Sequence, residues 1–190
     1  MHKIKRLDIN CISINSVLAF ISGLPLLLLS STLQAWYSQK GVDLFAIGSL
    51  SLLGLPYTLK FLWSPLLDSC GFSSDSPRRI WILISQFCVF TSLLILSFLD
   101  PINSPYLMIV FAFIASLSSA TQDMAVDAYR QVITPKRLRA LVVGYVTTSY
   151  RLAMVVAGGF ALVAADNYGW STTYKLMTLL LMMGFMFTWS

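Results

Sequence analysis

Long runs of apolar residues recur along the chain, separated by short polar segments. A membrane-spanning helix needs about 20 consecutive, mostly apolar residues. The runs meet or approach this length six times, and we predict helices over residues 12–36, 44–67, 80–99, 106–126, 140–165 and 174–190. The last run is still apolar at Ser190, so we expect a truncated sixth helix. The pattern predicts an all-α integral membrane protein, with residues 1–190 forming one six-helix bundle.

The composition supports a lipid exterior. Of the 190 residues, 57% are hydrophobic and 11% are charged, whereas a soluble globular domain carries about 25% charged residues. The net charge of +5 is spread over short loops and is not gathered into one basic face. We therefore expect the lipid bilayer as a partner and no nucleic acid.

The short loops differ in charge from one side of the predicted bundle to the other. Lys and Arg accumulate in short cytoplasmic loops of membrane proteins. The loops on the N-terminal side hold nine basic residues: Lys3, Lys5, Arg6, Arg78, Arg79, Arg130, Lys136, Arg137 and Arg139. The opposite loops hold only Lys40 and Lys175. This asymmetry predicts a multi-pass protein whose N-terminus lies in the cytoplasm.

The sequence contains no recognisable set of catalytic residues. The single histidine is His2, close to the N-terminus, and the three cysteines (Cys11, Cys70 and Cys88) lack the spacing of a metal site. No phosphate-binding loop or serine nucleophile motif is present. We therefore expect no enzyme, no cofactor and no bound metal, and cysteines that stay reduced.

Two cations lie inside predicted membrane helices. Arg151 falls about halfway along residues 140–165, where a cation costs roughly 2.5–3.5 kcal/mol on insertion scales. It should therefore face a structural ion pair or the carboxylate of a substrate. Lys60 precedes Asp68 by roughly 12 Å of helix. Its side chain could extend to the cytoplasmic interface, or it could line a transport path.

The helix over residues 106–126 ends in a charged segment. Asp123 and Asp127 are four residues apart and share a helical face, and Arg130 is spaced to pair with Asp127. Asp123 is the deeper acid, and a carboxylate removed from water binds a proton more readily. The segment predicts either proton coupling or a cytoplasmic gate that ties this helix to basic loops.

Prolines interrupt the first two predicted helices at Pro25, Pro56 and Pro65. Carbonyl groups freed by proline are tolerated in a membrane where neighbouring helices or a cavity satisfy them. These helices could therefore be moving cavity walls that pivot near Gly23, Gly54 and Pro56, or kinked parts of a rigid bundle.

Several segments resemble a known transporter family. Asp68-Ser69-Cys70-Gly71, followed by Arg78-Arg79, is similar to the loop that braces the cytoplasmic gate in the major facilitator superfamily, although Ser69 replaces the usual basic residue. Five further segments resemble the AmpG-type muropeptide permeases of that superfamily: residues 22–26, 33–36, 54–68, 120–128 and 150–152. The resemblance covers only the N-terminal half of the family's fold.

The resemblance implies import of anhydro-muropeptides across the bacterial inner membrane into the cytoplasm, together with protons, for peptidoglycan recycling. It places Gly23, Ala120 and Gln122 at positions sensitive to change in the family, and we assign them, with Lys60 and Arg151, to substrate binding or transport. Asp68, Asp123, Asp127 and Arg130 are assigned to proton coupling or the gate. A complete permease also needs a second, C-terminal six-helix half. The alternatives are a carrier of another solute, such as an acyl-coenzyme A or a drug-like compound, or a remnant that does not transport.

Overall fold

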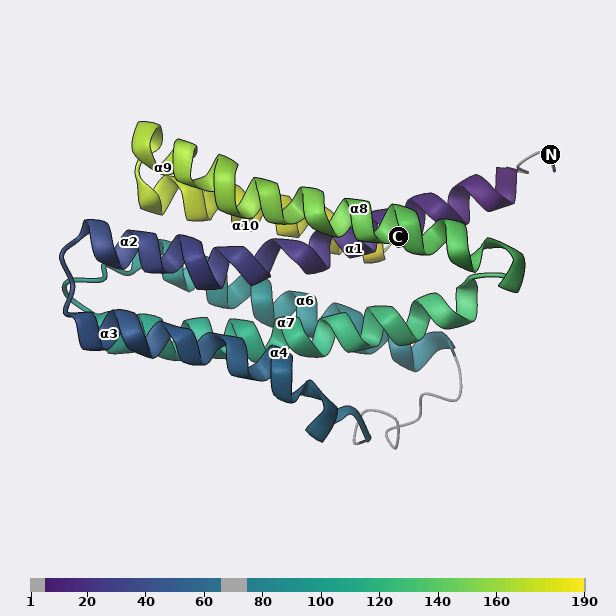
Figure 1. Cartoon of the computed structure of the whole chain (residues 1–190), viewed down its shortest axis with the longest axis horizontal. Helices are drawn as coiled ribbons and strands as arrows, with labels where there is room; N and C mark the ends of the chain where they lie inside the picture. Colours follow the sequence, from purple (N-terminus) through teal and green to yellow (C-terminus); the bar gives the residue numbers. More distant parts are fainter. Residues whose placement is uncertain (1–5, 66–74, 190) are drawn as a thin grey trace.

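A computed structural model describes residues 6–65 and 75–189, and the side chains of residues 6–7 and 75–78 lie outside that description. Within these two ranges the backbone is almost entirely helical and contains no strand. This confirms the all-α fold class. The helices form six consecutive runs that pass back and forth along the long axis of the molecule (Figure 1).

The first two runs change helix type along their length. The first run is continuous and consists of α1 (Arg6–Leu27), the π-helical turn η1 (Leu28–Thr32) and α2 (Leu33–Gln39). The second run alternates between α and 3₁₀ geometry in α3 (Leu44–Ser49), η2 (Leu50–Gly54), α4 (Leu55–Leu59) and η3 (Lys60–Leu62). The irregular turns follow Pro25 and precede Pro56, close to the pivots expected from the sequence. Whether these turns move remains a prediction.

The remaining four runs are longer or more regular. The third run is α6 (Asp75–Phe98) and the fourth is α7 (Pro105–Ile133). The fifth run consists of η4 (Lys136–Leu138), α8 (Arg139–Val155), the π-helical turn η5 (Val156–Phe160) and α9 (Ala161–Tyr168). The sixth run is α10 (Trp170–Trp189). Pro135 lies two residues after the end of α7 and cannot continue the helix, because it lacks the backbone N–H group.

Several helices extend past the ends expected from hydrophobicity. α1 begins at Arg6 instead of residue 12, and α7 continues through its charged segment to Ile133 instead of ending near Val126. In the described part of the chain, five runs are long and apolar enough to cross a membrane. α10 is not among them, because it begins with the polar segment around Thr172, Thr173 and Lys175.

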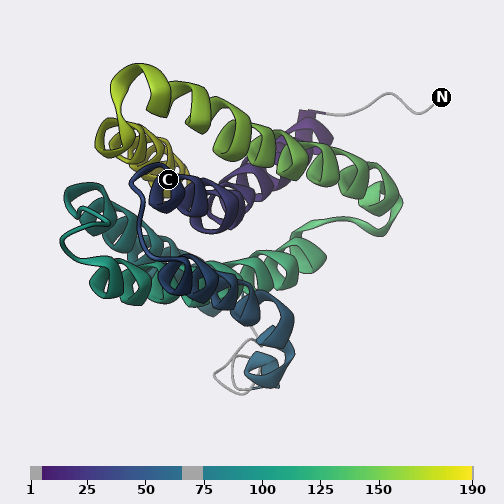
Figure 2. The same ribbon diagram turned by 60° about the vertical axis from the view of Figure 1, so that its left-hand side comes forward.

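The first run lies in the middle of the bundle. α1 contacts α7, α8 and α10, while α6 packs against both α7 and α10. α1 and α2 therefore lie between α8 and α9 on one side and α3, α4 and α7 on the other, while α6 and α10 contact each other directly (Figures 1 and 2). The N-terminus and the turn between α7 and α8 share one end of the bundle, and the turns after α2, α6 and α9 share the other.

The bundle core combines large apolar side chains with small residues. Leu28, Leu33, Tyr37, Met108 and Tyr174 are among the largest fully buried side chains. Fully buried alanines lie between them at positions 112, 115, 153, 157 and 161. Small residues let helix backbones approach closely, which replaces the hydrophobic driving force that lipid does not provide. The alanines therefore allow the first, fourth and fifth runs to pack tightly.

The two π-helical turns face each other across the first and fifth runs. η1 contacts η5, and the Thr32 hydroxyl of η1 donates a hydrogen bond to the Ala157 carbonyl of η5 at 2.7 Å. The Tyr174 hydroxyl of α10 donates to the Leu28 carbonyl at 2.9 Å. A π-helical turn interrupts the regular hydrogen-bond pattern of an α-helix. These side chains supply donors that hydrocarbon cannot supply.

Replacing the Thr32 hydroxyl tests this contact. Thr32→Val keeps the shape of the side chain but leaves the Ala157 carbonyl without its donor, so we expect the free energy of unfolding to fall by about 0.5–1.5 kcal/mol. Thr148→Val is the matched control, since Thr148 is exposed and bonds only within its own helix. Denaturant unfolding of the detergent-solubilised protein measures both. Equal stability of the two variants would contradict a structural role for the contact.

Candidate functional site

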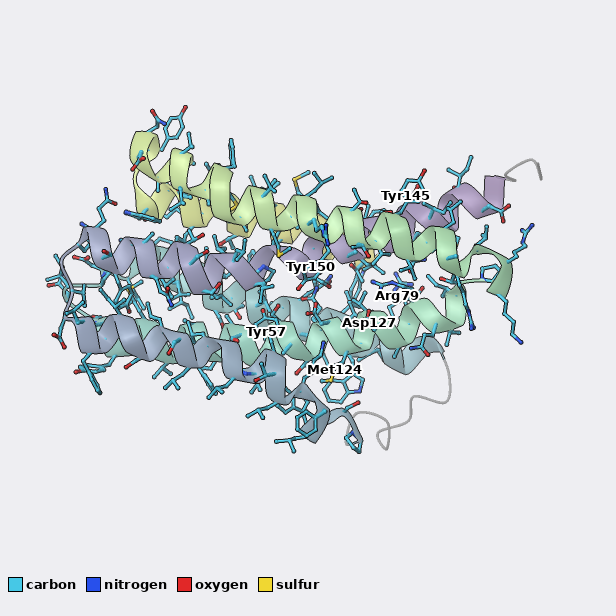
Figure 3. All side chains as sticks on the ribbon, in the orientation of Figure 1. Tyr57, Arg79, Met124, Asp127, Tyr145 and Tyr150 are labelled. Atoms are coloured by element: carbon cyan, nitrogen blue, oxygen red, sulfur yellow. The ribbon has the colours of Figure 1, made fainter. Side chains whose placement is uncertain are left out.

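A cavity of about 330 Å³ opens between the first, second, fourth and fifth runs. Its charged residues are Lys60 of η3, Arg151 of α8 and three residues of α7, and its other lining residues include Ser22 of α1 and Thr147 and Tyr150 of α8. Figure 3 shows Asp127 and Tyr150 reaching toward this space from α7 and α8. The structure therefore brings together residues that are up to about two thirds of the chain apart in sequence.

The three charged residues of α7 are Asp123, Asp127 and Arg130. The Arg130 guanidinium donates to the Asp127 carboxylate, with an Nη1–Oδ1 distance of 2.7 Å, as their spacing predicts. The Asp127 side chain is 56% exposed, so this pair adds little to stability. Its effect is to neutralise two of the charges that face the cavity.

Lys60, Arg151 and Asp123 form no direct ion pair within the described part of the chain. Asp123 is the most enclosed of the three and faces the charges of Lys60, Asp127 and Arg130 and the hydroxyls of Ser22 and Tyr150. Lys60 is only partly exposed and lines the cavity. Arg151 is exposed on the open side of the same cavity. Both intramembrane cations therefore lie where a polar ligand could reach them.

Gly23, Ala120 and Gln122 lie behind the cavity wall and do not line it. A Cβ atom on Gly23 would lie 2.9 Å from the Tyr150 carbonyl oxygen and 3.0 Å from the Ala153 Cβ. Ala120 and Gln122 are fully buried, and the Gln122 amide donates to the Ser22 hydroxyl at 3.3 Å. Gly23 therefore packs against Tyr150, and Gln122 holds Ser22; both Tyr150 and Ser22 line the cavity.

The expected gate residues are only partly described. Asp68 and the segment Ser69-Cys70-Gly71 lie outside the described residues, so their assignment remains a prediction. The Arg79 side chain, labelled in Figure 3, donates from Nε to the Thr188 carbonyl at 3.0 Å and from Nη2 to the Trp189 carbonyl. Arg79 thus connects α6 to α10 through the Thr188 and Trp189 carbonyls.

Sequence reasoning missed a second cluster, at the N-terminal end of the bundle. The Arg137 guanidinium donates to the Asp8 carboxylate at 2.6 Å, and the Asp8 side chain is only 6% exposed. The Asn15 amide donates to the Thr134 hydroxyl at 3.4 Å. These contacts tie α1 to the turn after α7. Asp8 is the one acid in the first turn of α1. Sequence reasoning did not use this signal, because the predicted helix begins only at residue 12.

Tyr57 was also missed. It comes from α4 and faces Ser119 and Asp123 of α7 as well as Tyr150 of α8. Asp123 is therefore framed by a tyrosine from each of two neighbouring runs. Among the described residues, no group of three or more His, Cys, Asp and Glu side chains is arranged to hold a metal ion.

The close approach at Gly23 gives a direct test of the wall. In Gly23→Ala the new methyl group meets a backbone oxygen, so α1 and α8 must separate, and we expect a loss of about 1–3 kcal/mol in the free energy of unfolding. Gly144→Ala is the control, because a Cβ at Gly144 of α8 meets no atom within 4 Å. Denaturant unfolding of both variants measures the difference. Equal stabilities would mean that the two helices do not pack this closely.

Comparison with known proteins agrees with this architecture. Residues 10–190 match the Major Facilitator Superfamily model. The chain is 40% identical over 166 residues to the anhydromuropeptide permease of Escherichia coli (strain K12), which is 87% of this chain and 34% of that protein. It is 37% identical over 169 residues to an uncharacterised protein of Haemophilus influenzae, covering 89% of this chain and 40% of that protein.

A third relative, named putative transporter AmpG 1, comes from Rickettsia typhi and is 34% identical over 161 residues, covering 83% of this chain and 36% of that protein. The chain thus spans about a third to two fifths of the length of these relatives. Two of the three carry names of permeases or transporters, and none carries the name of an enzyme. The resemblance to AmpG-type permeases is confirmed, and the chain belongs to the major facilitator superfamily of multi-pass membrane transporters.

Proposed function

We propose that this chain forms one six-helix half of a secondary transporter that imports anhydro-muropeptides across the bacterial inner membrane for peptidoglycan recycling. The observation that supports this most directly is the cavity at mid-bundle, where Lys60 and Arg151 form no direct ion pair among the described residues. Unpaired cations are costly in a membrane unless they face a water-filled cavity or a ligand. The similarity to the E. coli permease suggests which ligand this is.

The cavity chemistry suits a ligand that is part sugar and part peptide. Arg151 and Lys60 offer charge-assisted hydrogen bonds to carboxylates, while Ser22, Thr147 and Tyr150 offer hydroxyls to sugar and amide groups. Asp123 is the residue proposed to carry the proton, because it is the enclosed carboxyl and forms no direct ion pair in the described structure. Gly23, Ala120 and Gln122 act in this proposal by positioning the cavity wall.

The proposed gate lies at the N-terminal end of the bundle. There Arg137 and Arg139 lie between α7 and α8 and at the start of α8, and Asp8 holds Arg137. Arg79 lies in the first turns of α6. By the positive-inside rule this end faces the cytoplasm. Asp68, together with Asp127 and Arg130, belongs to the proposed gate on the strength of the family resemblance alone. A transport path also needs a second half facing the open side of the cavity.

Uptake of radiolabelled anhydro-muropeptide by a permease-deficient bacterium tests the function. We expect uptake when the chain is produced with the polypeptide encoded downstream of it, and none when it is produced alone. Arg151→Ala should weaken the apparent affinity about 10- to 100-fold, since hydrogen bonds to charged groups contribute about 1.5–3 kcal/mol. Lys175→Ala, which removes an exposed cation outside both the cavity and the proposed gate, should leave uptake intact.

Two results would speak against the proposal. Transport of an acyl-coenzyme A or drug-like compound that muropeptide fails to inhibit would favour another substrate. A chain that inserts in the membrane but takes up no solute in any combination would favour a remnant that does not transport.

A further inference from the structure

The groups that face Asp123 come from every run around the cavity. The first run contributes the Ser22 hydroxyl, the second run Lys60 and Tyr57, and the fifth run Tyr150. Asp127 and Arg130 share its own helix and pair with each other. Arg151 lines the same cavity from α8. Among the described residues, the charged side chains that line the cavity without a direct ion pair are therefore the cations Lys60 and Arg151 and the acid Asp123.

The net charge of these three side chains depends on whether Asp123 carries a proton. With Asp123 ionised, two cations and one acid leave a balance of +1, and with Asp123 protonated the balance is +2. An uncompensated charge that is withdrawn from water costs free energy, so a ligand that neutralises the cavity binds best. One ligand carboxylate neutralises the first state, and two carboxylates neutralise the second.

We propose that the cavity couples ligand charge to proton binding, so that a ligand with two carboxylates binds with one more proton on Asp123 than a ligand with one carboxylate. This inference rests on the proposed function and specifies its substrate class as anionic. The proton is taken up from the aqueous solution, where a buffer acid supplies it, and it forms an O–H bond with the Asp123 carboxylate. Nothing else is transferred.

Lys60 is the residue through which the ligand and Asp123 influence each other. It faces Asp123 from η3 and also lines the cavity that the ligand enters. A ligand carboxylate that approaches Lys60 takes over part of the attraction that favours ionised Asp123. The second carboxylate also repels the acid directly, since like charges close together favour the protonated form. Both effects place the extra proton on Asp123.

Three versions of one anhydro-muropeptide test the inference. They carry two free carboxylates, one free carboxylate with the other converted to an amide, or two amides. Their binding is measured between pH 6 and 8 in membranes that contain this chain and the polypeptide encoded downstream of it. Ligand carboxylates stay ionised in this range. We expect the affinity ratio of the two-carboxylate ligand to the one-carboxylate ligand to rise up to tenfold for each unit that the pH falls.

Two variants locate the proton. Asp123→Asn removes the titrating group, so the affinity ratio should become independent of pH while both ligands still bind. Lys60→Gln removes one positive charge. In this variant the affinity ratio of the one-carboxylate ligand to the diamide should depend on pH, and the ratio of the two-carboxylate to the one-carboxylate ligand should not. Lys175→Gln is the control, because it removes a cation that contacts Phe98 outside the cavity and should leave the original pattern in place.

The outcomes separate this inference from the proposed function. If the ligands bind but their affinity ratios do not depend on pH in the unmodified protein, the inference is wrong and the proposed function stands. The inference is also wrong if Asp123→Asn keeps the pH dependence, or if Lys60→Gln behaves like Lys175→Gln. Absence of binding by all three ligands to the inserted protein would overturn the proposed function, and the inference with it.

Discussion

Hydrocarbon cannot donate or accept hydrogen bonds, and every polar group that this chain places at membrane depth must therefore find a partner within the protein. Regular α-helix satisfies most of the backbone. Where the first and fifth runs change to π-helical geometry, side chains of neighbouring runs supply the donors, as Thr32 does for Ala157 and Tyr174 for Leu28. The irregular turns therefore depend on tertiary contacts, and the central position of α1 and α2 follows from the same need.

The same constraint arranges the charges. Charged side chains that cannot reach the membrane surface must pair or face a polar cavity. At the N-terminal end, Asp8 pairs with Arg137, and Arg79 binds the Thr188 and Trp189 carbonyls of α10. At mid-bundle, Lys60, Arg151 and Asp123 share one cavity without pairing directly within the described chain. The first arrangement connects neighbouring helices, whereas the second leaves three charged side chains in one cavity without a direct ion pair among the described residues.

Residues that do not line the cavity still affect its shape, because they pack closely against the helices and side chains around it. Gly23 lets α1 approach the backbone of Tyr150, and Gly184 of α10 packs against Ile21, where an added Cβ would lie 2.5 Å from the Ile21 Cδ1. Gln122 holds Ser22 through a buried hydrogen bond. A substitution at any of these positions displaces a helix or a lining side chain. Sensitivity of such positions to change therefore does not require that they contact the substrate.

The sequence by itself determined the fold class and singled out the charged residues that are candidates for a functional site. It could do so because the length of an apolar run and the presence of a charge within it are local properties. It identified Lys60, Asp123 and Arg151 from their depth alone. It did not locate the ends of α1 and α7, whose charged residues are kept helical partly by tertiary pairs such as Asp8 with Arg137, 129 residues apart. Only the tertiary structure decided that Gly23 and Gln122 lie behind the wall and that Tyr57 and Tyr150 frame Asp123, because helix rotation and depth are set by packing between runs.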